Sequence, residues 1–166
     1  DIQFALGGKG ANQAIACARL GGQVEFVACV GSDSAADLAL SEYRDAGIDV
    51  AHVSRVDAAT GSALIFVDES GENCIGVAAG ANDYLDHSRV AAAATCIEQA
   101  SHLLMQLETP VPSIQFAAEI ARAGDTRTIL NPAPAKPLPS ELLALVHIIT
   151  PNQSELARLT DRPVTS

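Results

Sequence analysis

The sequence Gly7-Gly8-Lys9-Gly10-Ala11-Asn12-Gln13-Ala14, near the start of the chain, carries the strongest indication of fold and function. It runs directly into apolar residues at helical spacing, and glycines at such a junction let a ligand approach the backbone closely. The free N–H groups of the helix start, the cation of Lys9 and the amide of Asn12 suit an anionic or polyhydroxylated small molecule. The spacing matches neither a P-loop nor a dinucleotide fingerprint. It also fits a simpler interpretation, a glycine-rich turn that only starts a helix.

Composition favours one domain with a core of alanine and aliphatic side chains, as is common where helices pack closely on a sheet. The 166 residues are 48% hydrophobic, which is enough for one such core. The net charge of −10 leaves no basic surface for nucleic acid or for an anionic membrane. No apolar run approaches the ~18 residues of a membrane helix, and no signal peptide pattern opens the sequence. We therefore expect a cytoplasmic protein that binds neither nucleic acid nor membrane.

The cysteines are far apart, form no C-x-x-C pair and have apolar neighbours: Cys17, Cys29, Cys74 and Cys96. We expect buried free thiols in a reducing compartment. The histidines show no ligand spacing and are expected at the surface or at strand ends: His52, His87, His102 and His147. Without a defensible Ser/His/Asp or Cys/His arrangement, covalent catalysis has no support.

Apolar strands alternate with amphipathic helices along most of the chain, which predicts a parallel sheet with helices on both faces. Helices are expected over residues 11–20, 34–46, 86–99, 112–123, 138–145 and 152–159, and sheet strands over 24–30, 50–56, 101–107, 126–130 and 146–149. Residues 62–67 and 73–77 read as a hairpin joined by an acidic, glycine-containing turn. Together with a short strand at about residues 2–6, this hairpin is expected to form a small β-sheet lid.

Polar residues stand where three of the predicted strands end: Glu108, Asn131 and Asn152. Ligands of open parallel sheets bind outside the carboxyl ends of the strands, so this agreement predicts a binding edge. Each residue also has a simpler interpretation, since asparagine beside proline forms turns and caps and a carboxylate suits a helix N-terminus.

Asn152 and Glu155 lie three residues apart at the start of the last predicted helix, so they share one face. An amide and a carboxylate placed so could arrange waters around Mg²⁺. The same spacing describes a capping box, in which each side chain bonds the backbone of the other residue. Spacing alone favours the capping box.

The whole chain resembles the ribokinase (phosphofructokinase-B type) family of sugar kinases. Besides the glycine-rich stretch, five segments occur in the order typical of that family: Gly31-Ser32-Asp33, Gly80-Ala81-Asn82, Met105-Gln106-Leu107-Glu108, Asn131-Pro132-Ala133-Pro134-Ala135 and Thr150-Pro151-Asn152. They span almost the entire chain, so accidental agreement is implausible.

The resemblance implies ATP-dependent phosphorylation of ribose at its 5-hydroxyl, and it implies roles for individual residues. The sugar would be bound by Glu108 and by the segment at the first helix: Gly8, Lys9, Gly10, Ala11 and Asn12. Asn152 would lie near the ATP phosphates, and Glu155 would help hold Mg²⁺ through water. Gln153 stands where family members often carry a second acidic residue. The lid would close over the sugar and join two subunits in a homodimer.

The chain is expected to be an α/β domain truncated at both ends. The family's opening strand would precede Asp1. Its Gly-Ala-Gly-Asp segment with the catalytic base, and much of the adenine and monovalent-cation (K⁺) sites, would lie beyond Ser166. We therefore expect no catalytic residue in this chain. Because loss of a catalytic base lowers the reaction rate by about 10²–10⁴-fold, we expect no appreciable activity from the chain alone. Two alternatives stay open: another sugar or nucleoside kinase of the family, and a non-catalytic sugar-binding or dimerising remnant.

Overall fold

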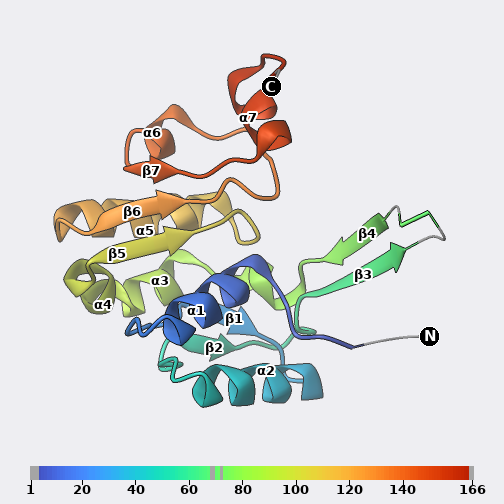
Figure 1. Cartoon of the computed structure of the whole chain (residues 1–166). Helices are drawn as coiled ribbons and strands as arrows, with labels where there is room; N and C mark the ends of the chain where they lie inside the picture. Colours follow the sequence, from blue (N-terminus) through green and yellow to red (C-terminus); the bar gives the residue numbers. More distant parts are fainter. Residues whose placement is uncertain (1–3, 68–69, 72, 165–166) are drawn as a thin grey trace.

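The computed structural model describes residues 4–67, 70–71 and 73–164 (Figure 1). The helices are α1 (Lys9–Arg19), α2 (Ser34–Asp45), a 3₁₀ helix (Gly80–Tyr84), α3 (His87–Ala92), α4 (Ala94–Gln99), α5 (Val111–Ala123), α6 (Ser140–Leu143) and α7 (Gln153–Thr160). The strands are β1 (Ala28–Val30), β2 (Val53–Arg55), β3 (Ser62–Val67), β4 (Asn73–Ala78), β5 (His102–Met105), β6 (Arg127–Leu130) and β7 (Ile148–Ile149).

The parallel pairing expected from the sequence is present, divided over two sheets. β1 pairs with β2, and β5, β6 and β7 pair in chain order, with parallel strands throughout. Cys29 of β1 packs in one core cluster with Val90 and Ala117 from the helices α3 and α5, and Leu103 of β5 packs against the same cluster. The two sheets therefore share one layer of covering helices.

Helices cover both faces of the β1–β2 sheet at β1, as its apolar residues predict. Successive strand residues point to opposite faces, so Cys29 and Val30 report on two different layers. Val30 packs with the cluster formed by α1 and α2, including Ala14 and Leu40, whereas Cys29 packs on the side of α3, α4 and α5. The α/β architecture is thus that expected from the sequence.

Some predicted boundaries are wrong. The helix expected over residues 86–99 is divided into α3 and α4 by Ala93, a fully buried residue with φ −98° and ψ 7°. The strand expected over residues 24–30 is reduced to β1, preceded by an isolated bridge between Glu25 and Asp49.

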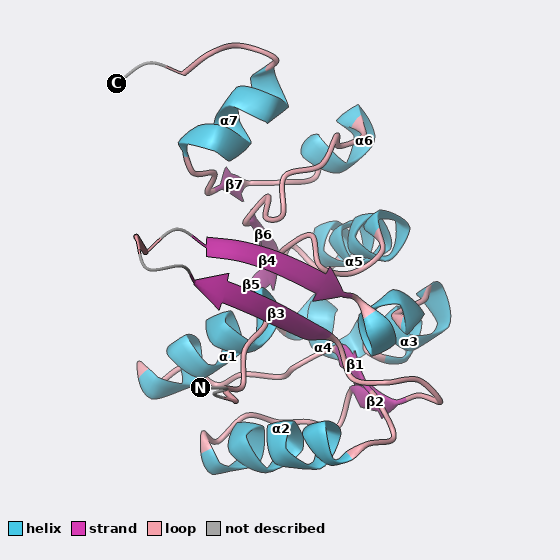
Figure 2. Cartoon of the chain, turned by 90° about the vertical axis from the view of Figure 1, so that its right-hand side faces the viewer, coloured by secondary structure: helices cyan, strands magenta, loops and turns pink. Residues whose placement is uncertain are grey.

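The predicted hairpin is formed by β3 and β4, which pair antiparallel from Ser62 opposite Ala78 to Val67 opposite Asn73. Figures 1 and 2 show it projecting from the body of the domain and passing in front of the edge to which β5 and β6 point. The third lid strand, predicted over residues 2–6, is not formed at residues 4–6, which are irregular and exposed. Residues 2 and 3 lie outside the described part.

The two predicted truncation points also lie outside the described residues. Asp1, which the family's opening strand would precede, and Ser166, beyond which the catalytic base is expected, are both in the terminal segments that the structure leaves undescribed. The position of the base therefore stays a prediction from the family resemblance.

All four cysteines are free, but their burial differs from the prediction. Cys29 is buried, Cys17 and Cys96 are half-buried, and Cys74 is exposed on the hairpin. The prediction of a buried thiol is wrong for Cys74 because both faces of its strand are uncovered.

No helix within the described residues is both long enough and apolar enough to cross a membrane.

Candidate active site

A carboxylate from a distant segment caps the first helix. Gly8 is the N-cap residue of α1, because its φ of 99° and ψ of 136° are not helical, and it has no side chain that could cap the helix. The backbone N–H of Lys9 instead donates to Oε2 of Glu108 over 2.7 Å. Anions are favourable at a helix N-terminus because unpaired N–H groups and the helix dipole converge there. This contact joins the first predicted sugar-binding segment to Glu108.

The glycines around this contact have a steric reason. At Gly8 the positive φ disfavours any residue with a Cβ, and the position faces Glu108. At Gly10 a Cβ would lie 2.7 Å from Nε2 of Gln106 and 3.5 Å from the ring of Phe26. The first turn of α1 therefore packs directly against the residues that follow β5. Gln106 was not among the predicted binding residues, although it stands two residues before Glu108.

The other predicted residues of this segment have different environments. Ala11 is buried, with 7% exposure, and serves the core beneath the helix. Lys9 is half-buried and Asn12 is exposed. The backbone N–H of Asn12 donates to the carbonyl of Gly8 over 2.9 Å, so it belongs to the first helical turn. Asn12 thus stands one turn along α1 from the N-cap residue Gly8.

The carboxyl ends of β5, β6 and β7 meet at one edge, as predicted. The N–H of Leu107 donates to Ala133 over 2.8 Å, and Nδ2 of Asn131 donates to the carbonyl of Thr150 over 2.9 Å. Lys136 also reaches this edge, with Nζ donating to the carbonyl of Leu107 over 2.8 Å. Lys136 was not among the predicted residues. Its position shortly after Asn131 on the same loop was the available signal.

Asn152 and Glu155 form the capping box that their spacing favours. Oδ1 of Asn152 accepts from the N–H of Glu155 over 2.8 Å, and Oε2 of Glu155 accepts from the N–H of Asn152 over 2.8 Å. Oε1 of Glu155 accepts from Nδ2 of Asn152 over 2.9 Å. Glu155 is 8% exposed. Each carboxylate oxygen accepts one hydrogen bond and keeps a lone pair, which fits a metal-bound water better than direct coordination of Mg²⁺.

The two residue groups stay separate. Lys9 meets Glu108, and Asn152 meets Glu155, but no hydrogen bond or ion pair joins these pairs within the described residues. They follow the two outer strands, β5 and β7, of the three-stranded sheet.

The hairpin is anchored beside this edge through Asp33, which follows β1. Oδ1 of Asp33 accepts from the hydroxyl of Thr60 over 2.6 Å and Oδ2 accepts from its N–H over 2.7 Å. Asp33 also caps α2 by accepting from the N–H of Ala36. The hydrogen bonds from Thr60, and then that from Ala36, hold the pKa of this carboxyl below its usual value. Two segments that the sequence shows far apart, at Gly31 and Gly80, both pack against residues 58–60 at this anchor.

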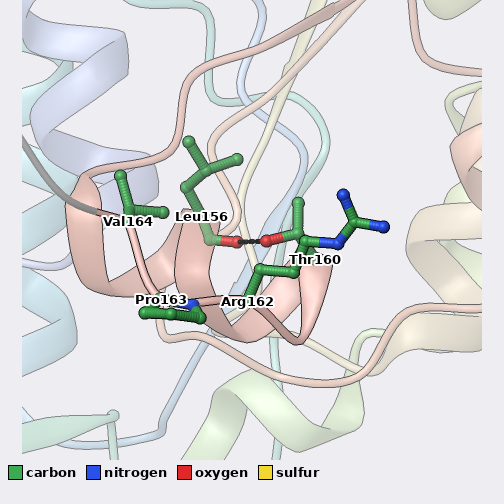
Figure 3. Close-up of a pocket in the computed structure, with 5 residues that line it drawn as sticks. All are labelled: Leu156, Thr160, Arg162, Pro163 and Val164. Carbon is green, nitrogen blue, oxygen red and sulfur yellow. Dashed lines mark hydrogen bonds between the residues drawn. The ribbon is translucent and has the colours of Figure 1, made fainter.

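A shallow hollow lies beside α7, apart from these residues (Figure 3). It is lined by Leu156, Thr160, Arg162, Pro163 and Val164. The hydroxyl of Thr160 donates to the carbonyl of Leu156 over 2.8 Å and is thereby satisfied within the helix. Among the described residues that line it, Arg162 is the one charged residue.

Comparison with known proteins decides the family. Residues 1–166 match the sequence model of the "pfkB family carbohydrate kinase" family. The chain belongs to the pfkB family of carbohydrate kinases. It is 47% identical over 161 residues to a ribokinase of Haemophilus influenzae, covering 96% of this chain and 53% of that protein. A ribokinase of Staphylococcus aureus is 44% identical, also over 161 residues, with 96% and 53% covered.

Solved structures agree with this family membership. The ribokinase of Arabidopsis thaliana, complexed with ribose and ATP, superposes with a TM-score of 0.90 at 29% identity. The match covers 99% of this chain and 54% of that structure. The chain thus has the pfkB-family fold, and it spans about half the length of the curated relatives that it matches.

Proposed function

We propose that the protein containing this chain transfers the γ-phosphoryl group of ATP to the 5-hydroxyl of ribose. The observation that carries the proposal is the contact between the first turn of α1 and Glu108. It joins residues 99 positions apart into one polar surface of N–H groups and carboxylate oxygens. Support for ribose and ATP comes from the relatives named ribokinase and from the Arabidopsis ribokinase, whose structure was determined with both molecules.

The sugar would lie against Gly8, Lys9, Gly10, Ala11 and Asn12. Gly8, which is exposed, allows the sugar's hydroxyls to approach the backbone, and the exposed amide of Asn12 can donate and accept. Glu108 uses one oxygen for the N–H of Lys9, so its other oxygen is available to accept from a sugar hydroxyl. A carboxylate acceptor orients such a hydroxyl more strongly than a neutral group does.

At the other end of the edge, Asn152 and Glu155 would face the ATP phosphates. Mg²⁺, when bound, neutralises charge on the phosphates. Glu155 would hold it through a coordinated water, because each of its oxygens already accepts one hydrogen bond. The capping box fixes both side chains. It would therefore position them for the phosphates and Mg²⁺ in addition to stabilising the start of α7.

The general base is assigned to no residue of this chain. We propose that it follows Ser166 in the longer protein, as the family resemblance implies, and we propose K⁺ only as an activator of that protein. The chain spans about half the length of its curated relatives, which leaves room in them for such a segment.

The β3–β4 hairpin would act as a lid over the sugar and as the contact between two subunits. Support comes from its projection across the binding edge (Figure 2) and from its exposed apolar side chains: Leu64, Ile65, Phe66, Val67, Ile75 and Val77. A lid that closes excludes water from the transferring phosphoryl group.

The experiment is a coupled kinase assay with Mg-ATP and a panel of ribose, 2-deoxyribose, fructose and adenosine. It compares the 166-residue chain with the longer protein to which we propose that it belongs. We expect the longer protein to prefer ribose and the chain alone to show no appreciable turnover. Preference for another sugar or a nucleoside would favour a different kinase of the family, and normal turnover by the chain alone would contradict the need for further residues.

In the longer protein, Glu108→Gln tests the residue that carries the proposal. Loss of a hydrogen bond to a charged group costs about 1.5–3 kcal/mol, so we expect kcat/KM for ribose to fall about 10–100-fold while KM for ATP stays unchanged. Glu119→Gln, an exposed carboxylate on α5, is the matched control. Unchanged ribose kinetics in Glu108→Gln would remove Glu108 from the sugar site. If the longer protein binds ribose in calorimetry but shows no turnover in the coupled assay, the non-catalytic alternative holds.

A further inference from the structure

Three side chains able to ligate a transition metal meet at the amino-terminal ends of β1 and β2. They are Glu25, His52 and Cys96, and one ligand atom from each lies within 4.8 Å of the other two. Glu25 precedes β1 and His52 directly precedes β2, whereas Glu108 follows the opposite, carboxyl end of β5. The cluster is therefore not part of the candidate sugar site.

The fold holds these three side chains on fixed elements. Glu25 stands at an isolated parallel bridge to Asp49, and the N–H of Asp49 donates to the carbonyl of Val24 over 2.8 Å. Cys96 lies on α4 between the buried residues Ala93 and Ile97 of the core. A constellation carried by a bridge, a strand start and a packed helix needs little rearrangement to accept an ion, which favours binding.

Exposure leaves a route for an ion from solvent. Glu25 is exposed, and His52 and Cys96 are half-buried. Burial, together with the hydrogen bond and charge of Glu25, raises the pKa of the Cys96 thiol to about 11. The charge of Asp49 acts on the thiol in the same direction. The isolated bridge pairs Glu25 with Asp49, so two acidic residues stand at this corner and favour a cation there.

The donor set selects the metal. Thiolate, imidazole and carboxylate together suit Zn²⁺, and three protein ligands leave its fourth tetrahedral position to water. Mg²⁺ and Ca²⁺ prefer sites built from oxygen alone. The cluster therefore differs in chemistry from the Asn152–Glu155 pair.

We propose that Glu25, His52 and Cys96 bind one Zn²⁺ ion, with water as the fourth ligand. On binding, the Cys96 thiol releases its proton to solvent and the sulfur bonds the metal. The ion ties α4 to the start of the β1–β2 sheet, which is a stabilising link between segments 44 positions apart in the sequence, His52 and Cys96. This proposal is independent of the kinase activity.

Cobalt substitution tests the site on the untagged, reduced chain. We expect one Co²⁺ per chain, with thiolate-to-cobalt charge-transfer absorption that disappears when Zn²⁺ is added. Removing a group that only hydrogen-bonds to a metal ligand weakens metal binding by about 10–100-fold. Removing a ligand itself should cost more, so we expect Cys96→Ser and His52→Gln to weaken Zn²⁺ binding by about 100-fold or more. The controls Cys17→Ser and His102→Gln should bind as the original chain does.

Alkylation gives a second measurement that needs no variant. With Zn²⁺ present, Cys96 should be protected from maleimide, as read by peptide mass spectrometry, whereas the equally half-buried Cys17 and the exposed Cys74 should react unchanged. Protection of Cys96 supports the site even where a variant does not fold. A lack of charge-transfer absorption, equal Zn²⁺ affinity in folded Cys96→Ser, or unprotected Cys96 would overturn the proposal.

Discussion

The β3–β4 hairpin and the β5–β6–β7 sheet are both rich in apolar residues, but the sheet buries one of its faces, whereas the hairpin exposes apolar side chains on both. In β6, Thr128 and Leu130 have no exposed surface, and Met105 of β5 is 5% exposed. In the hairpin, Leu64 is 68% exposed and Phe66 is 66% exposed. The sheet is stabilised by helices of the same chain, whereas the hairpin is held mainly by its cross-strand backbone pairs.

The hairpin is apolar on both faces, and this pattern explains why its exposed side chains suggest a binding surface. Directly paired residues share a face, so Ile65 and Ile75 point to one side together with Val67 and Val77. Leu64 and Phe66 point to the other side. Strands that are apolar on both faces are normally covered on both. The hairpin's sequence is therefore suited to contacts beyond those within the described chain, which is what the proposed sugar and second subunit would provide.

Truncating one leucine in each region is the strongest test of this comparison. Leu130→Ala should reduce the free energy of unfolding by about 3 kcal/mol, because a fully buried leucine leaves a cavity as well as losing its transfer energy. Leu64→Ala should change it by less than about 0.5 kcal/mol, as is usual for exposed positions. Urea unfolding followed by circular dichroism measures both. Similar losses in the two variants would mean that the hairpin is covered in solution.

The sequence predicted those parts of the fold that local patterns determine. Apolar runs alternating with helical periodicity predicted the parallel pairing, and the spacing of Asn152 and Glu155 predicted their capping box. The break at Ala93 was missed because alanine is the best helix former, and only the packing of α3 and α4 against the core divides the helix there.

The sites depend on contacts between distant segments, and spacing does not encode these. The bond from Lys9 to Glu108 connects residues 99 positions apart. Their roles could be inferred from family resemblance but not from the local sequence. No family resemblance pointed to the cluster of Glu25, His52 and Cys96, and the sequence predicted that the histidines lie at the surface or at strand ends. His52 is at a strand start as expected, but the sequence could not bring it together with Cys96.

A charge on one face of the hairpin is the next test, and it depends on the proposed dimer. Ile65 lies in the middle of the larger aliphatic face, so Ile65→Glu should weaken self-association by about 2 kcal/mol or more, as expected for a central interface residue. Leu64→Glu, on the opposite face, is the matched control and should leave the dimer intact. Analytical ultracentrifugation of the longer protein measures both. If only Leu64→Glu dissociates it, the two faces have exchanged roles, and if neither does, the hairpin is not the interface.

The smallest expected effect concerns the anchor between Asp33 and Thr60, which joins the hairpin to the segment between β1 and α2. The pKa of Asp33 is lowered in the folded chain by the Thr60 hydroxyl first and then by N–H groups. Its carboxylate therefore stabilises the fold above the ordinary value of 3.8, and this contribution is lost as the pH falls through the lower folded pKa. Asp33→Asn keeps an N-cap for α2, so it should be less stable at pH 7 by an amount that shrinks below about pH 4.

Urea unfolding at pH 7, 5, 4 and 3 measures this difference between Asp33→Asn and the original chain. Thr60→Ser retains the hydroxyl and should follow the original chain at every pH, whereas Thr60→Val loses the bond to Asp33 and should lose part of the pH dependence. A difference between Asp33→Asn and the original chain that stays constant with pH would show that the charge of Asp33 does not stabilise the anchor. The remaining contacts at this anchor, such as the N–H of Gly31 donating to Oγ1 of Thr60 and the N–H of Ser32 donating to Ala58, would then carry its stability.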